Sequence, residues 1–154
     1  MTACVKCGHD PAATIAASWS FVIEREVVSL NERSTNRGAW RTRRAYKADR
    51  KAWAWHLRDQ RLKLQIPAAR AKRRITLTRI YGPGCRAFDR DNLAGGLKLV
   101  VDDIVKEGLL LGDRPKDAEI HYEQRRVAAG EVAGLRVVIE ELAGQTPAGR
   151  QVER

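Results

Sequence analysis

Arg74-Ile-Thr-Leu-Thr-Arg-Ile-Tyr81 is the stretch that decides the fold. Apolar and polar side chains alternate along it, and β-branched residues are frequent, which predicts a strand with one face toward a core. Gly82-Pro-Gly84 follows at once and ends the strand in a turn. Residues 92–106 then carry leucine, valine and isoleucine at helical spacing, and Gly108 suits the position just after a helix. The centre of the chain therefore predicts a strand followed by an amphipathic helix.

Working outward, the same patterns predict four more elements. Two strands (18–23 and 118–127), a long basic helix that ends before Pro67 (40–64) and a last strand (135–140) complete the set. Their order is strand, helix, strand, helix, strand, strand. This order predicts an α+β domain in which a mixed β-sheet and two helices form two layers.

The length of 154 residues suits one domain. We expect that domain over residues 18–142, after an N-terminal extension (1–17) and before a flexible tail (143–154). The extension contains Cys4-x-x-Cys7 and His9, which resemble half of a zinc site. A closed zinc site needs four ligands, and no second pair is evident, so Zn²⁺ binding at Cys4, Cys7 and His9 stays open beside an incidental CxxC.

The net charge of +10 is concentrated in one segment. Residues 33–74 hold 15 Lys/Arg and two acids, a balance of +13, whereas the rest of the chain has a balance of −3. So much charge in one segment exceeds what solubility needs and predicts contact with nucleic acid.

The chain also has no apolar stretch long enough to span a bilayer and no apolar run near its start. We therefore expect a cytoplasmic protein with no membrane partner.

Acidic residues gather where the predicted strand meets the helix after it. Asp89 and Asp91 precede the helix, Lys98 and Asp102 share its polar face, and Asp113 follows in a turn. Clustered carboxylate oxygens suit Mg²⁺ or Mn²⁺, and a metal held there can activate water against a phosphodiester. The alternative is a purely structural role, in which Asp91 is the helix N-cap and the Lys98–Asp102 pair only solvates one face of the helix.

These residues resemble the RusA family of Holliday-junction resolvases of phage and prophage origin. The match consists of an ordered set, Asp89-Arg-Asp91-Asn92-Leu93, Lys98, Asp102, Gly108 and Asp113. Upstream, Phe21-Val-Ile, Ser29-Leu-Asn31 and the basic helix extend the resemblance over most of residues 18–140.

The resemblance implies a RusA-like fold and a Mg²⁺-dependent homodimeric endodeoxyribonuclease that nicks four-way DNA junctions in recombination and repair. It implies that Asp89, Asp91 and Asp113 bind the metal, where Mn²⁺ can replace Mg²⁺, and that Lys98 assists catalysis. Members of the family often have two adjacent acids where this chain has Gly112-Asp113. Asp117 is therefore an alternative to Asp113 as the third metal ligand. The spacing from Gly108 favours Asp113.

For the DNA itself we expect contacts from six residues: Asn31, Arg41, Arg43, Arg44, Lys47 and Arg90. Phosphate contacts by such side chains make binding sensitive to salt and weakly dependent on sequence. Two other functions stay open. One is a non-catalytic basic DNA-binding protein with an N-terminal zinc module, and the other is an RNA-binding accessory protein.

Overall fold

In the part of the chain that the structure describes, two helices and four strands follow one another in the predicted order. The computed structural model describes residues 14–29 and 39–143, and of residues 39–46 only the backbone. In that part of the chain the elements are β1 (Ile15–Ile23), α2 (Ala39–Lys63), β2 (Arg73–Tyr81), α3 (Arg90–Lys106), β3 (Ala118–Arg126) and β4 (Gly134–Leu142). The predicted α+β class, a mixed sheet with two helices, is confirmed.

The four strands form one sheet in the order β1-β4-β2-β3. β4 pairs antiparallel with both β1 and β2, and β3 pairs parallel with β2. A parallel pair needs a crossover connection, and α3 supplies it between β2 and β3. Both ends of α3 are therefore tied to neighbouring strands, which brings the turn before α3 and the turn after it close to β3.

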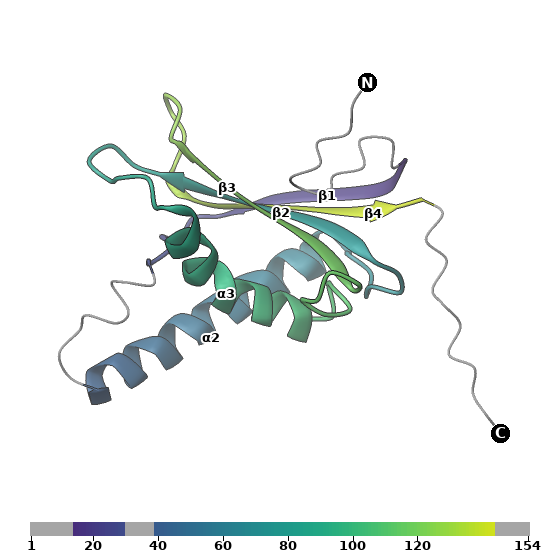
Figure 1. The fold of residues 1–154 in the computed structure, drawn as a ribbon, viewed down its shortest axis with the longest axis horizontal. Coiled ribbons are helices and arrows are strands. Elements are labelled where there is room, and N and C mark those ends of the chain that lie inside the picture. The colour runs from purple at the N-terminus through teal and green to yellow at the C-terminus, as the bar shows by residue number, and fades with distance from the viewer. Residues whose placement is uncertain (1–13, 30–38, 144–154) are drawn as a thin grey trace.

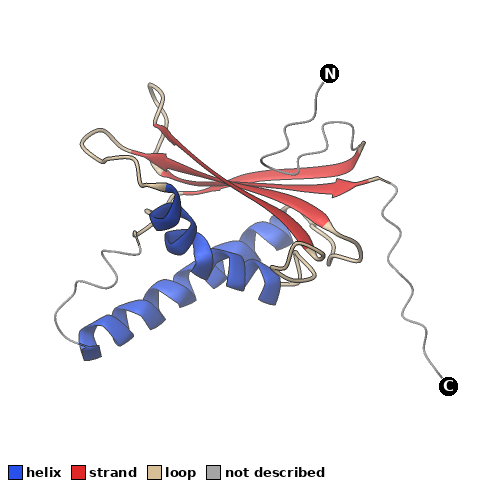
Figure 2. Ribbon diagram, in the orientation of Figure 1, coloured by secondary structure: helices blue, strands red, loops and turns tan. Residues whose placement is uncertain are grey.

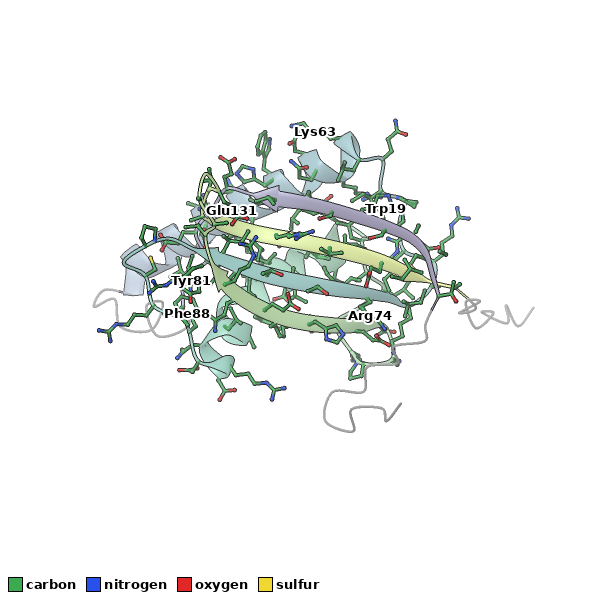
Figure 3. All side chains as sticks on the ribbon, turned by 90° about the horizontal axis from the view of Figure 1, so that it is seen from above. Trp19, Lys63, Arg74, Tyr81, Phe88 and Glu131 are labelled. Atoms are coloured by element: carbon green, nitrogen blue, oxygen red, sulfur yellow. The ribbon has the colours of Figure 1, made fainter. Side chains whose placement is uncertain are left out.

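Both helices cover the same face of the sheet (Figures 1 and 2). Trp53 and Leu57 of α2, one turn apart, are buried, as are Leu97 and Ile104 of α3. They pack with the inward residues of β1, β2 and β4 in one core. Figure 3 looks onto the opposite face, over which none of the described helices runs.

β1 begins earlier than expected. It starts at Ile15, inside the segment predicted as an extension, because β4 reaches Leu142 and pairs with Ile15. A shift in register lies between Ile15 and Ala17, and this irregularity interrupts the alternation that a sequence pattern detects.

A buried carboxylate joins the two helices. The side chain of Asp103 on α3 is only 3% exposed, and its Oδ1 lies 3.6 Å from Arg50 Nε of α2 and 3.6 Å from Lys106 Nζ. Its Oδ2 is buried without a hydrogen-bond partner among the described residues. Burial raises the pKa of Asp103, and Arg50 opposes that rise.

This raised pKa predicts how stability depends on pH. Between the unfolded pKa near 3.8 and the higher folded pKa, the native state binds more protons than the unfolded chain, so stability falls as pH rises. Asp103→Asn cannot ionise, and its thermal unfolding midpoint should rise relative to the wild type as pH increases through this window. A difference between the two midpoints that stays constant with pH would contradict the assignment.

Candidate active site around helix α3

The two aspartates that precede the helix in the sequence take different structural roles. Asp89 is the N-cap of α3, and its Oδ1 accepts a hydrogen bond from the Asn92 N–H at 2.8 Å. The prediction that Asp91 is the N-cap was wrong, because Asp89 satisfies the helix end two residues earlier and α3 begins at Arg90. Asp91 instead lies exposed in the first helical turn.

Hydrogen bonds from Asn92 lower the pKa of Asp89. Both carboxylates also lie at the positive end of the α3 dipole, a position that suits negative charge. The start of α3 therefore presents two exposed negative charges to solvent.

Lys98 joins two further carboxylates at the middle of the helix. Its Nζ lies 2.7 Å from Asp102 Oδ1, one turn on, and 2.7 Å from Asp113 Oδ2 in the turn after α3. The two acids raise the pKa of Lys98, and Lys98 in turn lowers the pKa of Asp113. Asp113 thus returns from the turn to the polar face of α3.

Gly108 and two buried leucines bring Asp113 back to Lys98. Gly108 has a φ of 71°, a left-handed conformation that lets the chain reverse after α3. Leu109 and Leu110 then enter the core and anchor the turn. No described ion pair joins Asp117 to Lys98; Asp117 packs so tightly on Gly112 that a Cβ there would lie 2.7 Å from its Oδ2.

The carboxylates suit a hard divalent cation by their chemistry. Mg²⁺ takes one or two carboxylates together with waters and substrate phosphates, so a full set of protein ligands is not required. Asp89, Asp91 and Asp113 are exposed and offer only oxygen donors. Across residues 14–29 and 39–143, no three His, Cys, Asp or Glu residues form a ready metal-binding group. The acids stand as one set at the start of α3 and another around Lys98.

A hollow opens beside Asp113 along the edge strand β3. Its volume is about 430 Å³, and its lining comes from Lys72, Asp113, Pro115 and residues 118–122. Tyr122 is half-buried there, and burial raises its pKa while the charge of Lys98 opposes the rise. Sequence reasoning missed Tyr122, because its place near Lys98 follows from the parallel pairing of β2 and β3.

Known proteins provide no identification. No family model, curated protein or solved structure matches this chain. The case for a function therefore depends on the residues themselves and on how the fold arranges them.

The predicted DNA-contact residues are only partly described. Lys47 on α2 and Arg90 at the start of α3 are exposed. Asn31 lies outside the described residues, as do the side chains of Arg41, Arg43 and Arg44, and so do the zinc candidates Cys4, Cys7 and His9.

Part of the basic segment serves the fold instead of the surface. Arg73 is 1% exposed, and its guanidinium bonds Glu141 at 2.8 Å and the carbonyl oxygens of Pro67 and Leu109. Arg74 pairs with Glu119 at 3.0 Å across to β3. Among the described side chains of this basic segment, most of the exposed cations lie on α2, where Lys47, Lys51 and Arg58 face solvent. None of the described helices has the length and apolar character to cross a membrane.

Proposed function

We propose that this protein is a metal-dependent endodeoxyribonuclease that hydrolyses phosphodiester bonds in branched DNA, with four-way junctions as its substrate. The observation that carries the proposal is the lysine bridge, in which Lys98 Nζ lies 2.7 Å from Asp102 and from Asp113. It brings a cation and two carboxylates together on the exposed side of the helix that Asp89 and Asp91 begin. This combination of charges suits phosphoryl chemistry.

Asp89, Asp91 and Asp113 are the residues we assign to Mg²⁺, with Mn²⁺ as a substitute. A bound divalent cation supplies Lewis acidity and a water of lowered pKa. Asp102 and Asp113 raise the pKa of Lys98 and hold its Nζ over the polar face of α3. In that state Lys98 can hold a phosphate oxygen and offset the negative charge that grows there during hydrolysis.

The basic helix α2 supplies the DNA-holding surface in this proposal. Lys47, Lys51 and Arg58 are exposed along it, and phosphate contacts by such side chains do not depend on base sequence. A four-way junction has two-fold symmetry, so two copies of the chain related by a two-fold axis would place one site on each of two opposed strands. We propose a homodimer that acts in the cytoplasm, as part of DNA recombination and repair.

The test uses a labelled synthetic four-way junction with Mg²⁺ or with EDTA, and the Asp91→Asn variant. We expect paired nicks that require Mg²⁺ and that fall at least about 100-fold in the variant, because the substitution removes a ligand charge. Junction binding, measured by gel shift, should survive. Asp59→Asn, which removes an acid from α2, is the matched control and should cut normally.

A non-catalytic DNA-binding protein is the second candidate. One observation favours it: Asp89 caps α3, and Lys98 already pairs with both Asp102 and Asp113, so these charges have structural partners. Tight junction binding without nicks, in Mg²⁺ and in Mn²⁺, would establish this candidate and rule out the nuclease.

A further inference from the structure

We propose that Gln124 and Arg79 are positioning residues that hold the Asp89 end of the active site in place; this inference rests on the proposed function. Neither residue belongs to the acidic set, and both lie on strands that flank the loop leading into α3. Gln124 is on β3, and Arg79 is near the end of β2.

Gln124 binds both backbone polar groups of the residue before Asp89. The Phe88 N–H donates to Gln124 Oε1 at 2.8 Å, and Gln124 Nε2 donates to the Phe88 carbonyl oxygen at 2.6 Å. One side-chain amide thus satisfies both backbone hydrogen-bonding groups of Phe88, as a neighbouring β-strand would. A paired donor and acceptor fix the orientation of a peptide more strictly than a single hydrogen bond can.

Arg79 contacts the same loop through its guanidinium group. Its guanidinium carbon lies 3.5 Å from the centre of the Phe88 ring and 5.0 Å from that of Tyr81, and its Nη1 donates to the Arg86 carbonyl oxygen at 3.1 Å. Arg79 is only 3% exposed, and cation–π contacts are stronger where water is excluded. Figure 3 shows Tyr81 and Phe88 at the same end of the sheet.

The consequence concerns the carboxylates. Residues 82–88 lie in the connection from β2 to α3. Around Gly82 and Gly84 no atom lies within 4 Å of where a Cβ would stand, whereas Phe88 at the end of the connection packs against the core. Gln124 and Arg79 bind its last residues directly. Metal sites need ligands held to within about 0.5 Å by such supporting contacts. We therefore infer that Gln124 sets where the Asp89 carboxylate stands relative to Asp91 and Lys98, which α3 itself holds.

The test compares Gln124→Leu and Gln124→Glu with the wild-type full-length chain. Leucine keeps the side-chain volume but loses both hydrogen bonds, whereas glutamate keeps the acceptor for the Phe88 N–H and loses the donor. Thr78→Val is the matched control, because it removes the 3.0 Å Thr78–Glu123 hydrogen bond between the same two strands on the other face. Readouts are Mn²⁺ affinity by calorimetry, Mg²⁺ dependence of cleavage, and hydrogen exchange of the Phe88 amide.

We expect Gln124→Leu to weaken Mn²⁺ binding about 10- to 100-fold and to speed exchange of the Phe88 amide. Gln124→Glu should fall between Gln124→Leu and the wild type in Mn²⁺ affinity while retaining protection of that amide. Thr78→Val should match the wild type in all three readouts despite a lower melting temperature. If the leucine variant does not fold, the glutamate variant carries the comparison alone.

Two failures are distinguishable. A wild-type protein that binds Mn²⁺ and cleaves junctions, with Gln124→Leu and Gln124→Glu showing the same Mn²⁺ affinity as the wild type, overturns the positioning role and leaves the nuclease intact. A wild-type protein that neither binds Mn²⁺ nor cleaves overturns both.

Discussion

Replacing Lys98 with methionine is expected to slow junction cleavage by about 10²- to 10³-fold, the cost of removing one preorganised charge from a phosphoryl-transfer site. Junction binding should be retained, because α2 carries the DNA-holding charge in the proposed function. Asp102 and Asp113 raise the pKa of Lys98, so the ammonium stays protonated across the neutral range. The loss should accordingly be the same at every pH between about 6 and 9. Single-turnover cleavage under Mg²⁺ measures it.

Lys63→Met is the control for that substitution. Lys63 forms a comparable lysine–aspartate pair on a helix, with its Nζ 2.8 Å from Asp59 four residues before it. At saturating protein, where a small loss of DNA affinity does not limit the rate, its loss should change cleavage by no more than about twofold, as for other surface substitutions. Equal cleavage by the Lys98 and Lys63 variants would mean that the Lys98–Asp102 pair is only a solvated helix face.

Asp113→Asn is expected to reduce cleavage at least about 100-fold, and Asp117→Asn to change it by about twofold or less. Asp113 contacts Lys98 and stands exposed beside the hollow along β3, so the amide removes both a ligand charge and the partner of the lysine. Asp117 faces Gly112 instead. Mn²⁺ affinity, measured alongside cleavage, separates a lost ligand from a disturbed lysine.

If Asp117→Asn reduced cleavage more than Asp113→Asn, Asp117 would be the third metal ligand. The turn after α3 would then have to rearrange on DNA. Equal, small effects in both would leave the metal to Asp89 and Asp91 alone, with phosphates and waters completing its shell. Each result therefore assigns the third carboxylate differently.

Much of the fold follows from short-range pattern. The alternation at residues 74–81 and the helical spacing at 92–106 predict β2 and α3 to within two residues, because each buries one face against a single core. The bulged start of β1 escaped detection because its pairing depends on β4, which lies more than 100 residues away in the sequence.

The site was predictable where sequence spacing equals spatial spacing. Lys98 and Asp102 are one helical turn apart, and their ion pair follows from that alone. The N-cap was misassigned by two residues, since Asp89 and Asp91 are chemically equivalent candidates and only the structure distinguishes them. Gln124 could not be found, because no local pattern relates it to Phe88, 36 residues away.

Arg73 and Arg74 show a different limit. Counted in sequence, they belong to the basic segment, but the fold places them between strands opposite Glu141 and Glu119. A charge total describes a chain, whereas a binding surface depends on which charges remain exposed.

The position of β4 between β1 and β2 has a consequence for synthesis. About 110 residues separate the end of β1 from the start of β4, so at roughly 5–20 residues per second the first strand waits on the order of ten seconds for its partner. During that time β1 presents Trp19, Phe21 and Ile23 on an unpaired strand. Such a segment is open to chaperones and to aggregation while the ribosome is still translating.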